Sequence, residues 1–297
     1  MLSIDPIHTD PTTMYQYLIG SVAPRPIAFV STINAAGETN VAPFSFFNAF
    51  SGNPPMVGFS SSGIKSDGTA KDTLLNVKTL GECVINVVNY NMVQQTSLSA
   101  IEFAHGVSEF TKTGLTPIPS EVVKPPRVLE SPVQMECKVE QIIKLGDIPS
   151  AGNLVICRIV RMHINPDILD VNGRIDPHKI DLMGRLGRAY YTRSSTDVQA
   201  IVRPYKPIPI GYDALPASLR ESNVLTGNNL AQLGSLIQLP TRNEILETKE
   251  NDNRIKKILF SSNITEGLHL YAREILTKGD TFHAAKIALL ADEIGNF

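Results

Sequence analysis

The stretch NVAPFSFFNAFSGNPP, residues 40–55, decides how the first half of the chain folds. Up to Phe47 it has the composition of a β-strand, but Pro43 interrupts the middle of the run. Proline cannot donate a hydrogen bond to a neighbouring strand, so it is excluded from the central strands of a sheet. We therefore expect an edge strand whose backbone is partly free from strand pairing.

Two interpretations of this edge strand remain open from its residues alone. In the first, Asn40 and Ser45 are polar contacts for a planar aromatic ligand, and Phe44, Phe46 and Phe47 are flat apolar walls around it. In the second, the strand is a bulged edge whose aromatic side chains belong to the hydrophobic core. The rest of the sequence has to decide between them.

The flanking sequence predicts an antiparallel sheet. Alternation and β-forming residues predict six strands, at residues 27–33, 39–47, 54–62, 82–89, 133–145 and 153–164. Two helices are expected, at residues 69–81 with Thr69 and Asp72 as a capping box, and at residues 91–106. Residues 112–132 are interrupted by Gly and Pro and predict a surface loop. Antiparallel hairpins with separate helices favour a mainly β fold, a closed barrel rather than a doubly wound sheet.

The composition changes near residues 202–216, VRPYKPIPIGYDALP, which are rich in proline and predict an extended linker. Beyond this segment apolar residues recur at helical spacing, and Thr226 and Thr241 are positioned as helix caps. We therefore expect a β domain over residues 1–195 and a linker with a C-terminal helical region over residues 196–297.

Composition excludes several classes of function. The 297 residues carry a formal net charge of −2, which does not predict a nucleic-acid or anionic membrane partner. No apolar run approaches a membrane span, and the first residues lack the pattern of a signal peptide. The three cysteines lie far apart in apolar runs and are expected to be core side chains in a reducing cytoplasm.

Common catalytic motifs are also missing from the sequence. The six histidines are scattered without ligand spacing, so a metal site is not expected. The segment GRLGRA, residues 184–189, lacks the second glycine of the dinucleotide fingerprint and is followed by strand-forming residues. Neither an acid–base pair nor an activated nucleophile is predicted.

Hydroxyl and charged side chains gather where strands end and where the first strong helix begins. Hydroxyls, lysines and a helix N-terminus together could bind a phosphate group, although each residue alone fits an ordinary turn or helix cap. The residues concerned are Ser31, Thr32, Ser45, Ser60, Ser61, Ser62, Lys65, Lys71, Asp72 and Thr73.

The segments VAPRPIAFVST, NVAPFSFFNAFSGNPP and KDTLLNV…ECVINVVN resemble, in order and spacing, the flavin reductase-like, FMN-binding split-barrel proteins. The resemblance covers residues 10–195 and is greatest to the flavoredoxins and the reductase components of two-component monooxygenases. It implies a six-stranded antiparallel split barrel with flanking helices, which forms a homodimer with FMN at the interface. The helical region beyond residue 195 is not part of this resemblance.

The resemblance also implies which residues contact the cofactor. The strand of the opening stretch would line the flavin ring, and the hydroxyls and the helix start would hold the ribityl chain and phosphate. The implied residues are Ser31, Thr32, Asn40, Val41, Ala42, Pro43, Phe44, Ser45, Phe46, Phe47, Ser60, Ser61, Ser62, Lys65, Lys71, Asp72, Thr73 and Arg185, with Arg25 as a further candidate.

The implied activity is hydride transfer from NADH or NADPH to FMN, with FAD as an alternative, exchanging flavin substrate. The flavin carries this chemistry, so no catalytic acid or base is needed. The alternatives are a flavin-binding electron carrier or flavin store, an oxidase of the pyridoxamine-phosphate type, and an interaction module based on the helical region. A monooxygenase or another electron acceptor is the expected protein partner.

Overall fold

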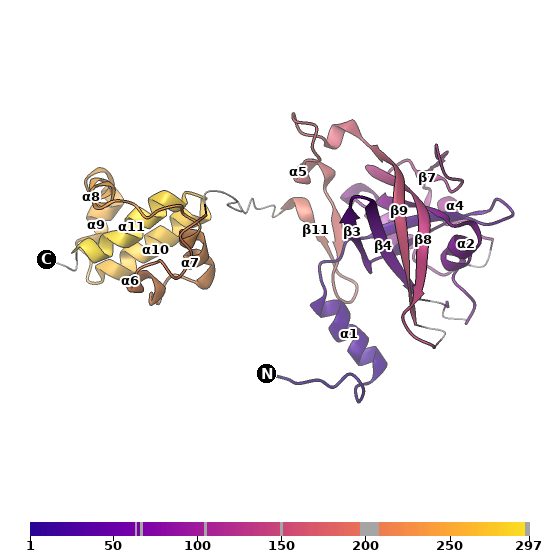
Figure 1. The fold of residues 1–297 in the computed structure, drawn as a ribbon, viewed down its shortest axis with the longest axis horizontal. Coiled ribbons are helices and arrows are strands. Elements are labelled where there is room, and N and C mark those ends of the chain that lie inside the picture. The colour runs from indigo at the N-terminus through magenta and orange to yellow at the C-terminus, as the bar shows by residue number, and fades with distance from the viewer. Residues whose placement is uncertain (63, 66–67, 104–105, 149–150, 197–207, 295–297) are drawn as a thin grey trace. The chain divides into compact units, whose positions relative to one another are not determined.

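The computed structural model describes the chain except residues 63, 66–67, 104–105, 149–150, 197–207 and 295–297. It contains two compact units, Met1–Gln199 and Ala200–Phe297, which are described separately here (Figure 1). The predicted linker falls partly on residues 197–207, which lie outside the described residues. Among the described residues, no helix has both the length and the apolar character needed to cross a membrane.

The first unit is built on a seven-stranded antiparallel sheet in the order β2-β1-β5-β8-β9-β4-β3. Its strands are β1 Ala28–Ile33, β2 Thr39–Phe44, β3 Phe47–Gly52, β4 Pro55–Ser62, β5 Glu82–Val87, β8 Val133–Lys144 and β9 Gly152–Ile164. Only Ser45 and Phe46 separate β2 from β3, yet these strands are the two edges of the sheet. The sheet therefore has to curl until its edges approach each other (Figure 1).

The two edges of the curled sheet meet without forming a ladder in the described part of the chain. Ser60 N of β4 donates to Phe46 O, in the connection between β2 and β3, at 2.8 Å, and the rings of Phe44 in β2 and Phe59 in β4 lie 5.1 Å apart. The barrel is therefore split, and the expectation of a closed barrel is corrected. Pro43 lies in an edge strand, as predicted, because β2 stands at the end of the strand order, next to β1.

The prediction of six strands is wrong by one. The predicted strand at residues 39–47 bends at Ser45 and Phe46, and Phe47 begins the separate strand β3, which pairs with β4. The interior of the barrel is apolar and includes Phe59, Ile85 and Val155. All three cysteines are free and buried, which confirms their prediction as core side chains.

Shorter helices and strands complete the first unit. The helices are α1 Pro11–Ser21, α2 Asp72–Leu80, α3 Val93–Leu98, α4 Glu109–Thr113 and α5 Pro177–Ile180, with short strands β6 Pro117–Ile118, β7 Arg127–Val128, β10 Met183–Arg185 and β11 Tyr191–Arg193. The helix expected at residues 91–106 is corrected to α3 after the 3₁₀ turn Tyr90–Met92, and residues 104–105 lie outside the described residues. The loop expected at residues 112–132 contains the β6–β7 pair.

A buried carboxylate fixes this loop to the sheet. Glu136 of β8 is 0% exposed, and it accepts hydrogen bonds from the backbone N–H groups of Glu121 at 2.9 Å, Val122 at 2.7 Å and Val123 at 3.1 Å. His163 Nε2 lies 2.7 Å from the same carboxylate. Burial acts to raise the pKa of Glu136, but these hydrogen bonds outweigh it and hold the pKa below its ordinary value of 4.5.

This lowered pKa makes the stability of the first unit depend on pH. Since the folded pKa lies below the unfolded value, Glu136 stabilises the fold above about pH 4.5, and this contribution is lost as the pH falls through the folded pKa. We expect Glu136→Gln to lower the free energy of unfolding at pH 7, and the difference from wild type to shrink toward pH 3. Urea denaturation at both pH values measures this difference. An equal difference at both would contradict the assignment.

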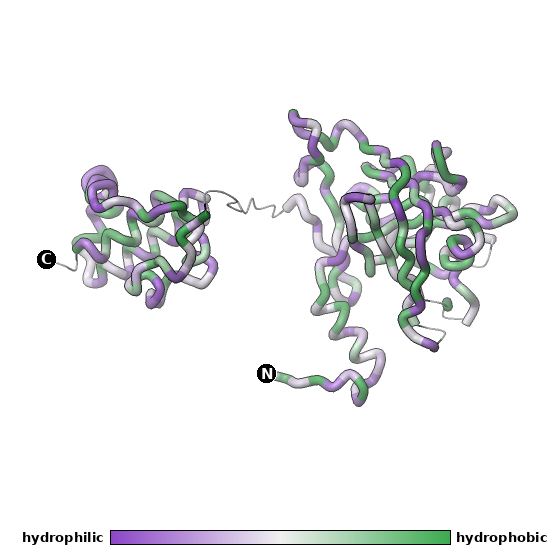
Figure 2. Tube along the Cα trace, viewed as in Figure 1, coloured by the Kyte–Doolittle hydropathy of each residue, from purple (hydrophilic) through white to green (hydrophobic). Residues whose placement is uncertain are grey.

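The second unit is helical, with α6 Ala217–Arg220, α7 Gly227–Gly234, α8 Arg242–Asn251, α9 Asn253–Ile258, α10 Ile264–Thr277 and α11 Thr281–Ile294. Thr226 and Thr241 cap the starts of α7 and α8, as predicted, and each cap forms a capping box. Figure 2 shows hydrophobic and hydrophilic residues alternating along α10 and α11. Their apolar faces form a separate core that includes Leu268, Leu276 and Ile287.

Candidate functional site

A pocket lies where the edge strand β2 meets the start of α2. Many of the residues predicted to contact a cofactor line it: Asn40, Ala42, Pro43, Phe44, Lys65, Lys71, Asp72 and Thr73. The opposite wall comes from the segment Ser99–Phe103, between α3 and α4, and from Glu109 of α4. The volume of the pocket is about 80 Å³, which suits a group the size of a phosphate better than a whole flavin.

The start of α2 gives the pocket its capacity to bind an anion. The predicted capping box is wrong, because α2 begins at Asp72 with Lys71 as the N-cap residue, and the Lys71 side chain makes no capping hydrogen bond. Lys65 N bonds to Thr69 O at 2.7 Å, which holds Thr69 in the preceding turn instead. Lys71 adds no side-chain cap at this helix start, and the backbone N–H groups and dipole of a helix N-terminus favour an anion.

Both lysines of the pocket are paired with carboxylates. Lys65 Nζ lies 2.7 Å from Asp72 Oδ2, and these side chains are only 11% and 18% exposed. Lys71 Nζ lies 2.9 Å from Glu102 Oε1. The positive charge needed for a phosphate is therefore present, but it is balanced by neighbouring carboxylates.

A chain of polar side chains supports the pocket from behind. Asn40 Nδ2 donates to Thr73 Oγ1 at 2.9 Å, and Asn76 Nδ2 donates to Thr32 Oγ1 at 3.0 Å. Thr32 and Thr73 are buried. Because Thr73 accepts the bond from Asn40, its own proton can be donated to a ligand. This arrangement orients Thr73 and places Thr32 behind the pocket.

Glu109 of α4 is hydrogen-bonded to the backbone of the edge strand β2. Its Oε2 accepts the backbone N–H of Val41 at 3.0 Å, and burial raises the pKa of this carboxyl group. Sequence reasoning missed Glu109 and the segment Ser99–Phe103. They lie far along the chain from β2, and nothing in their local pattern indicates that they meet it.

Other predicted residues of the opening region lie outside this pocket. Ser31 is on the opposite face of β1 and bonds to Pro126 O, and Val41 is buried in the core on that side. Ser45 accepts a bond from Arg25 Nε at 3.4 Å. Phe46 is 38% exposed beside Tyr15, whereas Phe47 packs against the barrel core.

The serines that end β4 and the arginine of β10 also lie outside it. Ser61 is buried and donates to Ser62 O at 3.0 Å, Ser62 donates to Ile64 O at 3.2 Å, and Ser60 bonds through its backbone to Phe46. Arg185 stacks over Tyr191 at 4.6 Å. The structure does not bring these side chains to the start of α2.

The Arg25 guanidinium is hydrogen-bonded to backbone carbonyl groups of the protein. It donates to Ile19 O at 2.6 Å, to Val22 O at 2.5 Å and to Leu186 O at 3.2 Å, so it ties the end of α1 to the residues after β10. The side chain is buried, and three backbone carbonyls take its donors. This arrangement leaves little capacity for a phosphate or nicotinamide.

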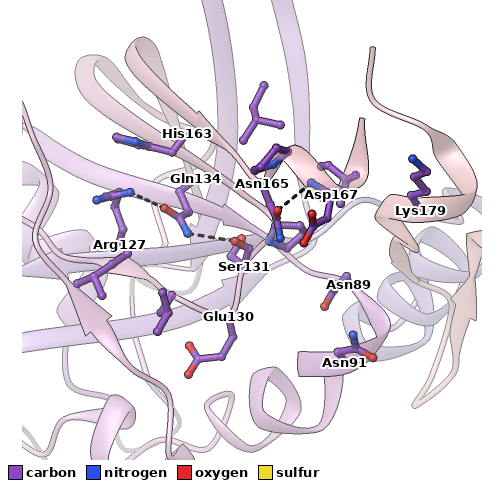
Figure 3. A pocket seen from close by; sticks show the side chains of 16 residues that line it. Asn89, Asn91, Arg127, Glu130, Ser131, Gln134, His163, Asn165, Asp167 and Lys179 are labelled. Atoms are coloured by element: carbon purple, nitrogen blue, oxygen red, sulfur yellow. Dashed lines mark hydrogen bonds between the residues drawn. The ribbon is translucent and has the colours of Figure 1, made fainter. Parts of the chain in front are cut away.

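A larger pocket of about 560 Å³ lies elsewhere in the first unit, and Figure 3 shows its polar lining. None of the predicted cofactor residues lines it. The Arg127 and Lys179 side chains of this pocket already donate hydrogen bonds within the protein. Arg127 donates to Gln134 Oε1 at 2.9 Å, and Lys179 donates to Leu169 O at 2.6 Å. Gln134 in turn donates to Ser131 O at 3.0 Å (Figure 3). We therefore favour the smaller pocket at α2 as the functional site.

Comparison with known proteins identifies the family. Residues 20–178 match the family described as flavin reductase like domain. The chain belongs to this family. The resemblance predicted from the sequence is thereby confirmed, and family membership supports a flavin-related oxidoreductase function. An uncharacterized protein of Halalkalibacterium halodurans is 41% identical over 179 residues, which cover 60% of this chain and 85% of the relative.

Two solved structures are similar to the first unit. Nitrilotriacetate monooxygenase component B from Bacillus cereus is 34% identical, with a TM-score of 0.63 over 67% of this chain and 98% of that protein. The 2-nitrobenzoate 2-nitroreductase NbaA of Pseudomonas fluorescens is 28% identical, with a TM-score of 0.60 over 69% of this chain and 98% of that protein. The split-barrel architecture is supported by a further solved structure, a protein with split barrel domain from Shewanella frigidimarina, which is 22% identical with a TM-score of 0.59 over 69% of this chain and 100% of that protein.

Proposed function

We propose that the protein is an FMN-binding oxidoreductase of the flavin reductase type, which uses NADH or NADPH as reductant. One observation carries the proposal: in a chain of this family, eight of the residues predicted to hold a flavin line one pocket beside α2. Bound FMN would supply the redox chemistry by accepting a hydride from the nicotinamide. The protein's own residues then have to bind and orient the flavin.

The residues of the pocket fit the phosphate end of FMN. The first N–H groups of α2 and the Thr73 hydroxyl are donors, and Lys65 and Lys71 supply charge. Asn40 orients Thr73 through their 2.9 Å hydrogen bond. The cofactor residues proposed here are therefore those that line this pocket.

The flavin ring needs more room than this pocket offers, because cofactor pockets typically enclose roughly 300–1,000 Å³. We propose that the ring extends from the phosphate site over Pro43 and Phe44 toward the corner between β2 and β3. Exposed apolar side chains near this corner, Phe46 and Phe50, suit coverage by a second copy of the chain. The homodimer thus remains a proposal, which light scattering of the purified protein tests.

The similarity to a monooxygenase component supports a further proposal, that reduced flavin or electrons pass to a partner enzyme. The alternative is a flavin-binding carrier or store without turnover. Steady-state oxidation of NADH and NADPH with added FMN or FAD separates these functions. Turnover supports the reductase, whereas saturable flavin binding without nicotinamide oxidation supports the carrier or store.

The experiment that tests the proposed function is a titration with FMN, followed by the quenching of flavin fluorescence, and then anaerobic addition of NADH and NADPH. We expect saturable quenching and loss of the yellow colour with at least one of the two reductants. A protein that gives no saturable quenching with FMN or FAD is not a flavoprotein of this type.

A further inference from the structure

Glu102 lies in the pocket where a flavin phosphate is expected. Its carboxylate is 2.9 Å from Lys71 Nζ, and Lys71 is the residue that immediately precedes α2. The segment Ser99–Phe103 that carries Glu102 forms one wall of the pocket. The chain therefore presents a carboxylate to the lysine that a phosphate would use.

We infer that Glu102 competes with the flavin phosphate for Lys71, and so determines how tightly phosphate-bearing flavins are held. This inference rests on the proposed function and adds a specificity-determining residue to it. The competition makes FMN an exchanging ligand, because binding its phosphate requires the Glu102–Lys71 ion pair to open.

The charges around the pocket support this competition. Among the described residues that line the pocket, the acidic ones are Asp72, Glu102 and Glu109, and the lysines are Lys65 and Lys71. A phosphate of about two negative charges would add to this group, so it could not share Lys71 with Glu102 without repulsion. Removing the Glu102 charge therefore favours phosphate more than it favours an uncharged ligand.

The two ion pairs differ in how easily they can open. Asp72 lies on α2 itself, and its pair with Lys65 is only 11–18% exposed. Glu102 lies outside any helix or strand, and its pair with Lys71 is 29–30% exposed. A partly exposed pair contributes little to stability, so opening the Glu102–Lys71 pair costs less than opening the more buried pair of Asp72 with Lys65. Phe103, the residue after Glu102, lies near α4, because Lys112 Nζ of that helix is 5.9 Å from the centre of the Phe103 ring.

The test compares FMN with riboflavin, which has no phosphate, on wild type and Glu102→Gln. We expect Glu102→Gln to bind FMN about 3- to 10-fold more tightly, and riboflavin within about two-fold of wild type. FMN release measured by stopped-flow should slow by a similar factor. Glu102→Ala should behave in the same way.

Two further variants show whether the effect acts through Lys71. Glu140→Gln removes the same charge and an ion pair with Arg158, at 2.6 Å on the exposed face of β8, and should leave FMN binding unchanged. In a Lys71→Met background, Glu102→Gln should change FMN affinity by less than about two-fold, because the contested lysine is gone.

The outcomes separate the inference from the proposed function. Equal changes in FMN and riboflavin affinity, no change in either, or an undiminished effect in Lys71→Met would overturn the role of Glu102 while flavin binding stands. If folded wild-type protein binds neither FMN nor riboflavin, the proposed function itself fails.

Discussion

Replacement of Lys65 with methionine is expected to weaken FMN binding by about 10- to 150-fold. A charge-assisted hydrogen bond contributes about 1.5–3 kcal/mol, and each 1.4 kcal/mol is a factor of ten in affinity. Lys65 is 11% exposed and also neutralises Asp72 at 2.7 Å. Its loss therefore removes a phosphate contact and also the cation that pairs with the Asp72 carboxylate beside the phosphate. Fluorescence titration measures the change.

Riboflavin and a control variant make this prediction specific to phosphate. Riboflavin should bind Lys65→Met and wild type with similar affinity, because it carries no phosphate. Lys78→Met changes an exposed lysine in the last turn of the same helix and should bind FMN like wild type. If Lys65→Met keeps wild-type affinity for FMN while thermal melting shows it folded, the phosphate does not bind at this pocket.

The second large effect concerns the helical unit. Leu268 of α10 is 0% exposed, so Leu268→Ala should lower the free energy of unfolding of this unit by about 2–5 kcal/mol. Leu270 on the same helix is 40% exposed, and Leu270→Ala is the matched control with a change below about 1 kcal/mol. Urea denaturation followed by circular dichroism measures both.

FMN binding by these two variants tests whether the pocket forms independently of the helical unit. All residues of the proposed pocket belong to the first unit. We therefore expect Leu268→Ala and Leu270→Ala to bind FMN with wild-type affinity under conditions where both stay folded. A loss of FMN binding in Leu268→Ala alone would contradict a pocket formed by the first unit independently of the helical unit.

The edge strand could be predicted from the sequence because the effect of a proline on strand pairing depends on that residue alone. Pro43 lacks an N–H group, and this alone placed β2 at an edge. The bend at Ser45 and Phe46 was not predicted, because both residues are compatible with a continuing strand. It results from the curling of the whole sheet, which sends the chain from one edge to the other. Tertiary structure therefore accounts for the extra strand.

The predicted site residues that share a face lie together at the pocket beside α2, whereas the others lie apart from it. Alternation along a strand puts Thr32 and Ser31 on opposite faces, so a run of hydroxyls cannot all reach one ligand. Thr32 lies behind the pocket, whereas Ser31 anchors Pro126. Glu102 and Glu109 were not predicted, because their contacts with Lys71 and Val41 join parts of the chain that are distant in sequence.

A crystal structure of the protein with FMN tests the central claim most directly. We predict that the phosphate lies within hydrogen-bond distance of the first N–H groups of α2 and of Thr73, with the ring over Pro43 and Phe44. We also predict that Glu102 has moved away from Lys71. A structure in which the FMN phosphate binds elsewhere, with the pocket beside α2 unchanged, would contradict the account.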